Sequence, residues 1–345
     1  MARPRARRGF IAMLDRRTAL LGAAALLALS PGAARAANKT FRLAIVHPSH
    51  PVSGMTEAGI AQYRAFFREL RRLGYAEGRN LLVDRWSAEG QAGRYLELAR
   101  AVLAQSPDVI LAGGTGPVTA LQASTRTTPI VGIMSDPVAA GLAFSLARPG
   151  GNVTGVAIDA GEAFHGKRLE LLLDIAPAAK RVAYLLAADR SDLGVPISVL
   201  DFAKHRGVAL FSVRIEGVVP LPAYENAFAV MRQERADALF VGTAPTHLTH
   251  RATIVALANA ARIPTSYQWR DFVGLGGLMS YAPSLPDLYS RCASQVDRIL
   301  KGANPAEMPI LQPEKFELAV NVKTAKSLGL AVPEAILARA DEVIE

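Results

Sequence analysis

Short apolar runs alternate with amphipathic segments along most of the chain. Phe41–Val46 is an apolar run rich in strand formers, and Ala58–Leu73 then places aromatic and aliphatic residues close to helical spacing. Asp108–Ala112 is nearly all apolar and is followed by a glycine-rich turn. Continuous apolar strands that alternate with helices are typical of a parallel sheet with both faces covered. The pattern therefore predicts an α/β fold.

This alternation runs twice through the chain. The first series of predicted strands is Phe41–Val46, Leu81–Trp86, Asp108–Ala112, Ile130–Met134 and Val153–Val156. The second series is Arg181–Leu186, Ala209–Val213, Ala238–Val241, Pro264–Tyr267 and Leu278–Tyr281. Helices are predicted between the strands, including one long helix over Thr246–Ala260. We expect two Rossmann-like lobes, residues 37–157 and 158–283, each a parallel sheet flanked by helices.

The rhythm changes after Pro283. Leu288–Leu300 has the spacing of one long amphipathic helix, and Ala303–Pro313 is proline-rich and extended. Glu317–Asn321 is a further candidate strand, and Pro333 opens a final predicted helix. We expect residues 284–345 to form a tail that crosses back between the lobes.

Residues 1–36 have the features of an export signal. An arginine-rich segment precedes Ala19–Ser30, which is almost purely apolar but only about 12 residues long, too short for a bilayer span. Ala34-Arg35-Ala36 has the small-x-small pattern of a signal-peptidase site, which predicts cleavage near Ala36. The pair Arg16-Arg17 resembles a twin-arginine signal, and the general secretory route is the alternative. We expect a periplasmic protein without stable membrane insertion.

The export signal also explains most of the positive charge. The net charge of the chain is +9, and residues 1–36 hold seven arginines and one aspartate, which is six of those nine charges. No basic cluster stands out in the remainder, so nucleic acid is not an expected partner. The single cysteine, Cys292, forbids an internal disulfide. Because Leu288 and Val296 lie at helical spacing from it, we expect a buried thiol.

The chain offers no constellation for catalysis, a metal or a cofactor. His47 and His50 are three residues apart, as are His247 and His250, but the further ligands of a metal site are missing nearby. Ser135-Asp136 has no histidine close in sequence that would suggest a triad. Neither a Walker A lysine nor a dinucleotide-binding Gly-x-Gly-x-x-Gly is present. We expect a protein that is not an enzyme and that needs no cofactor.

Several sequence blocks carry a family resemblance over nearly the whole chain after residue 36. They are Arg72–Asn80, Ser135–Val138, Leu146–Gly155, Gly166–Leu172, Gly276–Tyr281 and Phe316–Asn321. The chain resembles the ABC transporter substrate-binding proteins related to the tryptophan/tyrosine uptake family. The resemblance implies a type I periplasmic-binding-protein fold, with two lobes that close on a small amino-acid-like or carboxylate ligand. It also implies the membrane permease of an ABC transporter as partner. A ligand-sensing subunit that presents the solute to a membrane receptor or kinase would use the same cleft and is the alternative.

The expected ligand site lies where the strands end. Open parallel α/β sheets bind ligands outside the carboxyl ends of their strands, and two facing lobes border one cleft. The segments at these ends are His47–Ser53, Gly113–Gly116, Ser135–Pro137, Ala187–Ser191, Thr243–Thr246 and Tyr267–Asp271. Within them we expect the ligand-binding residues to be Ser49, Gly114, Thr115, Ser135, Asp136, Thr243, Tyr267 and Trp269. A hinge near Ala157–Ala163 would absorb the rotation of the lobes.

Three of these features suggest a particular contact with the ligand, and each also has an interpretation without a ligand. Gly113–Gly116, followed by Pro117 at the expected first helical position, would offer backbone N–H groups to a carboxylate, or would be only a tight turn. Asp136 would pair with an amino group of the ligand, or would cap a helix over Ala139–Leu146. Tyr267 and Trp269 would stack on a flat ligand, or would pack between the lobes.

Overall fold

The structure is a computed structural model that describes residues 39–158, 162–187, 194–215 and 220–345. The export signal predicted over residues 1–36 therefore lies outside the described residues. Thr40–Glu345 forms one unit, which contains both lobes. Within the described residues each of the ten strands predicted for the two lobes is present, with ends that shift by at most two residues. The prediction of two α/β lobes is confirmed.

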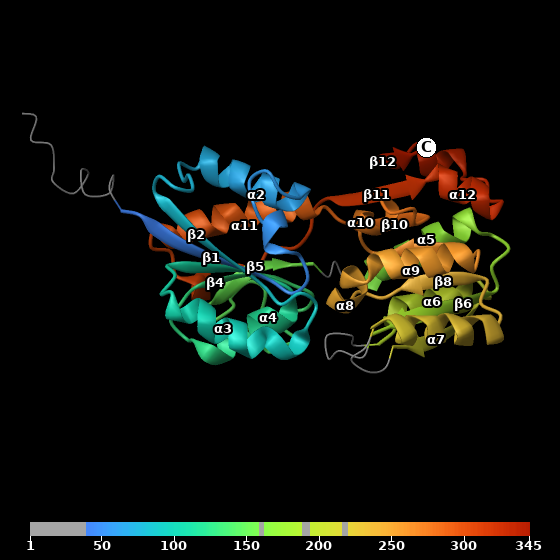
Figure 1. Ribbon diagram of the computed structural model, residues 1–345, viewed down its shortest axis with the longest axis horizontal. Helices are drawn as coiled ribbons and strands as arrows, with labels where there is room; N and C mark the ends of the chain where they lie inside the picture. The colour runs from blue at the N-terminus through green and yellow to red at the C-terminus, as the bar shows by residue number, and fades with distance from the viewer. Residues whose placement is uncertain (1–38, 159–161, 188–193, 216–219) are drawn as a thin grey trace, which may run out of the picture. The chain divides into compact units, whose positions relative to one another are not determined.

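The first lobe contains a parallel sheet that, over the described residues, has five strands in the order β2-β1-β3-β4-β5 (Figure 1). Its strands are β1 Phe41–His47, β2 Leu81–Ser87, β3 Val109–Gly113, β4 Ile130–Met134 and β5 Val153–Ala157. Its helices are α2 Ala61–Arg72, α3 Tyr95–Ala104 and α4 Thr115–Ser124, together with α11 Leu285–Leu300 from the end of the chain.

Alternating residues of β1 explain why this sheet is covered on both faces. Leu43 and Ile45 are fully buried in a cluster with apolar residues of α2 and α11. Ala44 and Val46 point the other way, into a cluster with residues of α3 and α4. A strand that is apolar on both faces reads as a continuous hydrophobic run, which is the pattern of Phe41–Val46.

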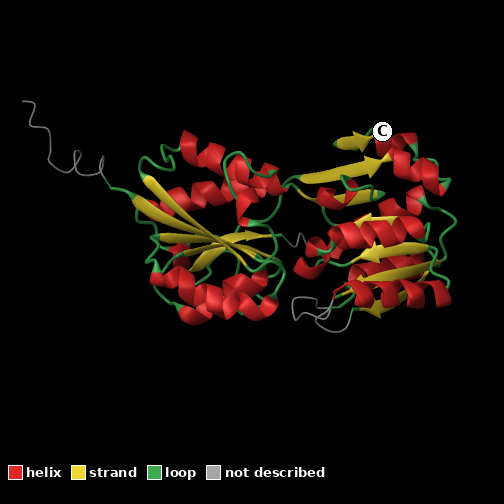
Figure 2. Ribbon diagram, viewed as in Figure 1, coloured by secondary structure: helices red, strands yellow, loops and turns green. Residues whose placement is uncertain are grey.

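The second lobe contains a sheet of seven described strands in the order β12-β11-β10-β9-β8-β6-β7, and Figure 2 shows its strands and helices by type. Its strands are β6 Arg181–Leu186, β7 Ala209–Arg214, β8 Ala238–Val241, β9 Thr265–Tyr267, β10 Met279–Pro283, β11 Phe316–Asn321 and β12 Glu342–Ile344. Its helices are α5 Glu162–Ile175, α6 Ile197–His205, α7 Pro220–Gln233, α8 Pro245–Thr249, α9 Arg251–Ala260, α10 Arg270–Val273, α12 Val322–Leu328 and α13 Glu334–Leu337.

This sheet differs from the expectation at one edge. β11 pairs antiparallel with β10, from Met279 opposite Val320 to Pro283 opposite Phe316, and β12 pairs parallel with β11. The apolar run Glu317–Asn321 predicts a strand but not its direction, because buried strands of either direction are apolar. β12 and the short helices α10 and α12 were not predicted, since elements of three to seven residues leave too few positions for a periodic pattern.

Three helix predictions are wrong in detail. The helix expected over Thr246–Ala260 is two helices, because the backbone of His250 leaves helical geometry, with φ −98° and ψ 21°. α4 begins at Thr115 rather than at Pro117, since Gly114 precedes it as the N-cap residue. No helix forms over the described residues Ala139–Leu146, where the Pro137 carbonyl accepts hydrogen bonds from the N–H groups of Leu142 and Ala143 in a compact turn.

The chain after Pro283 contributes to both lobes. α11 lies against α2 in the first lobe, where Cys292, Ala293 and Val296 are fully buried. Burial raises the pKa of the Cys292 thiol, which confirms the expected buried cysteine. β11 and β12 then extend the sheet of the second lobe. The core of the first lobe is therefore completed by a helix that lies in sequence between strands β10 and β11 of the second lobe.

The contribution of α11 to the first lobe can be measured. Val296→Ala removes two methyl groups from a fully buried side chain, so we expect the free energy of unfolding to fall by about 2 kcal/mol. Urea unfolding followed by circular dichroism provides the measurement. Arg298→Ala on the exposed face of the same helix is the matched control, and an equal loss in the two variants would contradict this packing of α11.

Candidate functional site

A cavity of about 470 Å³ opens at the carboxyl ends of strands from both sheets. The residues at or just after these strand ends are His47–His50, Gly113–Gly116, Ser135 and Ile158 from the first lobe, and Thr243–Pro245, Gln268 and Trp269 from the second. The rest of the lining comes from Gln62, Ala92, Tyr95, Ile133, Leu248, Leu285 and Tyr289. The volume lies within the range of roughly 300–1,000 Å³ that is usual for pockets that bind small molecules.

The lining of this cavity is largely apolar, with a set of uncharged polar groups. Over the described residues it contains hydroxyl, amide, imidazole and indole groups, but no side chain of Asp, Glu, Lys or Arg. Burying a net charge in such a site would cost free energy that no opposite charge of the lining offsets. Among the described residues, the lining therefore offers its ligand uncharged hydrogen-bonding groups and apolar surface.

The loop after β1 supplies two of the imidazoles. The Nδ1 atom of His47 accepts hydrogen bonds from the backbone N–H groups of Ser49, at 3.0 Å, and His50, at 2.8 Å. The two imidazole rings lie 4.2 Å apart, and Gln62 Nε2 lies 3.3 Å from His50 Nε2. Burial, and then the neighbouring His50, lower the pKa of His47 well below its ordinary value. The His47 ring is therefore neutral at physiological pH.

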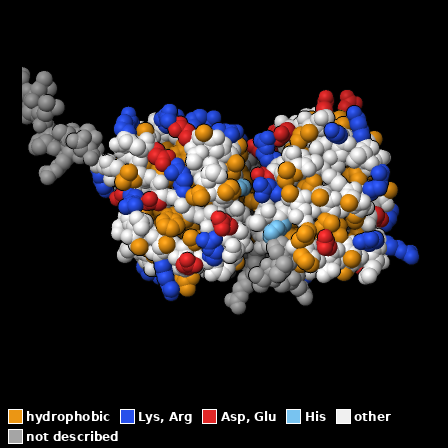
Figure 3. Space-filling model, in the orientation of Figure 1, with side chains coloured by type: hydrophobic (Ala, Val, Ile, Leu, Met, Phe, Trp, Pro, Cys, Tyr) orange, Lys and Arg blue, Asp and Glu red, His pale blue; other side chains and the backbone are white. Residues whose placement is uncertain are grey.

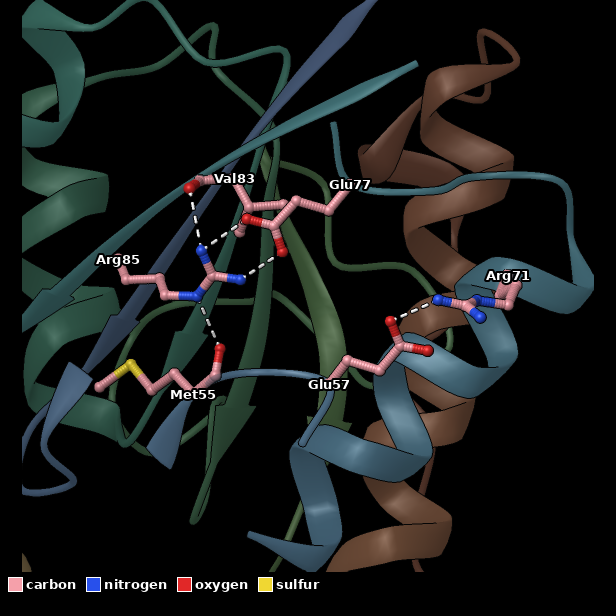
Figure 4. A network of polar contacts seen from close by, with 6 residues as sticks. All are labelled: Met55, Glu57, Arg71, Glu77, Val83 and Arg85. Atoms are coloured by element: carbon pink, nitrogen blue, oxygen red, sulfur yellow. Dashed lines mark hydrogen bonds and ion pairs between the residues drawn. The ribbon is translucent and has the colours of Figure 1, made fainter. Parts of the chain in front are cut away.

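An arginine on β2 holds the far part of the same loop (Figure 4). Arg85 Nε donates a hydrogen bond of 2.8 Å to the Met55 carbonyl, and its Nη1 donates one of 2.7 Å to Glu77. Arg85 Nη2 contacts the second carboxylate oxygen of Glu77, so this pair is bidentate. The segment between β1 and α2 is thereby fixed to the edge strand of the sheet.

The amino end of α4 forms another part of the first-lobe wall. Gly114 has φ +82°, a conformation that side chains with a Cβ rarely adopt, and its N–H donates to the Ile133 carbonyl at 2.7 Å. The N–H groups of Thr115 and Gly116 follow in the first helical turn, where no helical carbonyl is available to accept from them. The Thr115 hydroxyl oxygen accepts from Ser135 N–H at 3.1 Å. This arrangement presents donors and a helix terminus of partial positive charge to the cavity.

Two contacts define the second-lobe wall. Ser49 Oγ donates a hydrogen bond of 3.1 Å to the Pro245 carbonyl, which joins the two walls directly. Behind the loop after β8, the fully buried Arg168 of α5 donates from Nη2 to the Val241 carbonyl at 3.0 Å, and its guanidinium lies 4.1 Å from the Phe240 ring centroid. Burial lowers the pKa of Arg168 to about 10. Arg168 therefore fixes the end of β8, from which Thr243 enters the cavity.

Six of the eight residues expected at the site line the cavity: Ser49, Gly114, Thr115, Ser135, Thr243 and Trp269. The structure brings them together from loops that are up to about 220 residues apart in sequence. The other two expected residues, Asp136 and Tyr267, lie outside the lining.

Asp136 has the geometry of the capping alternative, around a turn instead of a helix. Its Oδ1 accepts hydrogen bonds from the N–H groups of Val138, at 3.0 Å, and Ala139, at 2.9 Å. A carboxylate of this kind holds the turn that directly follows Ser135. We propose that Asp136 acts on the site by positioning Ser135.

Tyr267 belongs to the interior of the second lobe. Its side chain is fully buried and stacks on Phe272, with ring centroids 4.8 Å apart, and a Cβ at Gly277 would lie 2.6 Å from its ring. Burial raises its pKa. Trp269, two residues further on, lies past the end of β9 and reaches the cavity. The two aromatic residues therefore differ in environment because Tyr267 is the last residue of the strand and Trp269 follows it.

Sequence reasoning missed the cavity residues that helices supply. Gln62 and Tyr289 lie within α2 and α11, and Tyr95 is the first residue of α3. The expectation that ligands bind at the carboxyl ends of strands does not point to residues within helices. Gln62 carried a usable signal, because it is a polar residue on the buried face of an amphipathic helix.

Other sequence expectations fall on or near the site. The expected loop Ala187–Ser191 and hinge Ala157–Ala163 lie partly outside the described residues.

The described part of the chain holds no group of three or more His, Cys, Asp and Glu side chains that would bind a metal. No helix among the described residues is long and apolar enough for a bilayer span. On the face seen in Figure 3, the basic and acidic side chains of described residues are interspersed.

Comparisons with known proteins agree with this architecture. A family model described as ABC transporter substrate binding protein matches residues 49–344. A curated protein of Clostridioides difficile, named tyrosine-binding protein, is 24% identical over 273 residues, which is 77% of this chain and 76% of that protein.

Two solved structures are similar along nearly their whole length. A protein of Streptococcus pneumoniae, described as an ABC domain in complex with L-Trp, is 22% identical with a TM-score of 0.79, over 89% of this chain and 100% of that chain. A protein of Vibrio cholerae is 25% identical with a TM-score of 0.77, over 88% of this chain and 100% of that chain. The Streptococcus structure, at this identity, supports the fold alone.

The histidine behind the second-lobe wall makes stability depend on pH. His247 of α8 is buried, with Nδ1 2.8 Å from the Tyr224 hydroxyl, and burial lowers its pKa from 6.5 to about 4. As the pH falls through 6.5 the unfolded chain binds a proton that the folded chain excludes, so stability is lost down to the folded pKa. Between pH 7.5 and 5 we expect His247 to lower the free energy of unfolding by about 2 kcal/mol, measured by urea titration.

Two variants isolate this effect. His247→Gln should reduce the loss of stability between the two pH values by about the same amount, because the titrating group is gone. His205→Gln, at an exposed histidine of α6, should keep the pH dependence of the wild type. A wild-type pH dependence in His247→Gln would contradict the assignment.

Proposed function

This chain belongs to the family of ABC transporter substrate-binding proteins, and we propose that it captures a zwitterionic amino acid with a flat side chain for an ABC-type uptake system. Capture takes place in the periplasm, after export directed by residues 1–36, and the membrane permease of the transporter receives the ligand. The observation that carries the proposal is the cavity between the strand ends of the two sheets, whose described lining residues combine apolar and aromatic surface with uncharged polar groups.

The charges of an amino acid suit this lining. The carboxylate would accept hydrogen bonds at the amino end of α4, where the Thr115 and Gly116 N–H groups and the helix dipole favour negative charge. The ammonium group would donate to hydroxyl and carbonyl oxygens of the lining, such as those of Ser49 and Ser135. Since the two ligand charges cancel, no charged side chain is needed.

The ring of the ligand has aromatic partners in the same cavity. Trp269 comes from the second lobe, and Tyr95 and Tyr289 from the first. Offset or edge-to-face contacts with such rings contribute about 0.5–1.5 kcal/mol each beyond the area that they bury. The names of two similar proteins, which refer to tyrosine and to L-Trp, support the same ligand class.

Binding from both lobes implies a mechanism of closure. A ligand that contacts His47–His50 and Thr115 on one side and Thr243 and Trp269 on the other stabilises the arrangement in which both walls are close. The hydrogen bond between Ser49 and the Pro245 carbonyl belongs to that arrangement. Affinity in the micromolar range, about −8 kcal/mol, is expected for a small ligand held in this way.

The two tryptophans of the chain allow a direct test with L-tyrosine. Only Trp269 lines the cavity, whereas Trp86 lies on β2. In Trp86→Phe, L-tyrosine should change the emission of the remaining tryptophan with a midpoint in the micromolar range. Trp269→Ala should weaken binding about tenfold in titration calorimetry, because it removes a large stacking surface.

A comparison of benzoate with aromatic amino acids tests the proposed ligand class. Benzoate, which has a ring and a carboxylate but no ammonium group, should bind more weakly than L-tyrosine because it would bring a net charge into the uncharged lining. If L-tyrosine, L-tryptophan and L-phenylalanine all fail to bind the wild-type protein, the proposed ligand class is wrong. Native mass spectrometry of the molecule that co-purifies from the periplasm would then identify the true ligand.

A further inference from the structure

Backbone hydrogen bonds determine which nitrogen of the His47 ring accepts and which donates. Its Nδ1 atom accepts from two N–H groups, those of Ser49 and His50, at 3.0 and 2.8 Å. An imidazole nitrogen that accepts hydrogen bonds carries no proton, so in the neutral ring the proton must be on Nε2. The last residue of β1 is therefore a hydrogen-bond donor at Nε2.

The donor edge of this ring lies beside the amino end of α4. A Cβ built on Gly113 would be 2.7 Å from His47 Cδ2 and 3.2 Å from Nε2, so this edge of the ring lies against the glycine backbone. Both His47 and Gly113 line the cavity. The absence of a side chain at residue 113 is what allows the imidazole to lie at this point.

A hydroxyl that is free to donate lies in the same wall. The Thr115 hydroxyl oxygen accepts from Ser135 N–H at 3.1 Å, which leaves its hydrogen to donate elsewhere. Thr115 and Gly116 N–H add the donors of the helix end. His47 Nε2–H and the helix-end N–H groups can only donate and the Thr115 hydroxyl can donate, so this part of the cavity suits an atom that accepts.

We propose that His47 is the specificity-determining donor of the site, and that its Nε2–H binds a carboxylate oxygen of the ligand beside the amino end of α4. The assignment rests on the proposed function and adds an orientation to it. The carboxylate lies in the first lobe, and an ammonium group is disfavoured beside His47 because the Nε2–H and the helix-end N–H groups would point their hydrogens at it. An amine that lacks the carboxylate is therefore rejected.

His50 has a different role from His47. Its Nε2 atom is paired with Gln62 Nε2 at 3.3 Å, so its ring is engaged with α2. His47 has no comparable side-chain partner at Nε2 among the described residues. His50 is thus tied to α2, whereas His47 supports the loop through Nδ1 and donates to the cavity through Nε2.

Two substitutions at residue 47 separate donation to the ligand from support of the loop. His47→Asn keeps an oxygen at the position of Nδ1, which can accept from Ser49 and His50, and leaves no donor at the position of Nε2, because its amide nitrogen takes the position of Cδ2. His47→Gln places an amide N–H near the position of Nε2 and removes the acceptor. We expect His47→Asn to bind L-tyrosine about 10- to 100-fold more weakly at near wild-type stability. His47→Gln should bind within about tenfold of the wild type, with a lower midpoint of urea unfolding.

Tyramine, which is tyrosine without the carboxylate, gives the readout that a supporting role would not change. The wild type should prefer L-tyrosine to tyramine, and His47→Asn should lose about 10- to 100-fold of that preference because tyramine does not use the donor. His205→Asn, at an exposed histidine of the second lobe, is the matched control and should leave both affinities unchanged.

Each outcome decides the assignment. The preference should fall in His47→Asn, and ¹⁵N NMR of the free wild-type protein should show the His47 proton on Nε2. An unchanged preference in His47→Asn, equal weakening of L-tyrosine and tyramine, or a proton on Nδ1 would overturn the role of His47 and leave the proposed function intact. Failure of the wild type to bind L-tyrosine, L-tryptophan and L-phenylalanine would instead overturn the proposed function.

Discussion

Parallel pairing of the strands is the constraint on which the site depends. In the first lobe, β1 lies between β2 and β3, and every pair of this sheet is parallel in register, with Val46 opposite both Trp86 and Ala112. Parallel strands end at the same edge, so the loops that follow them meet there although helices separate them in sequence. His47, Gly114 and Ser135 reach one cavity for this reason alone. Backbone groups hold several of its side chains, such as His47 and Thr115.

The same constraint made much of the fold predictable. A parallel strand is buried on both faces, so it appears as a continuous apolar run, and each such run of the two lobes became a strand. The rule of strand ends then selected loops that do line the cavity. What the rule could not decide is the direction of one side chain at a strand end. Tyr267 and Trp269 are two residues apart, yet Tyr267 is in the core and Trp269 lines the cavity. With both faces of the sheet apolar, alternation carries no information on which ring points inward.

Electrostatics of the site also lay beyond the sequence pattern. Asp136 is a carboxylate at a strand end, but its Oδ1 is engaged by the N–H groups of Val138 and Ala139. A short polar side chain near such N–H groups makes local bonds first, since these need little ordering of the chain. The cavity is left with neutral groups whose polarity is set by their backbone partners, as at Thr115 and His47. Whether such a group donates or accepts can be decided only when its hydrogen-bond partners are known.

The position of α11 has a consequence for how the protein is made. The first lobe cannot complete the burial of the α2 face of its sheet until residues near Val296 exist, and these are synthesised after strands β6 to β10 of the second lobe. During synthesis the first-lobe chain therefore carries an uncovered apolar surface for the time needed to add well over a hundred residues. Contacts of such long sequence separation form slowly and expose the chain to aggregation meanwhile. The first lobe can thus complete its folding only late in translation. A chaperone that shields α2 and its face of the sheet would act on the first lobe until the last fifth of the chain has been synthesised.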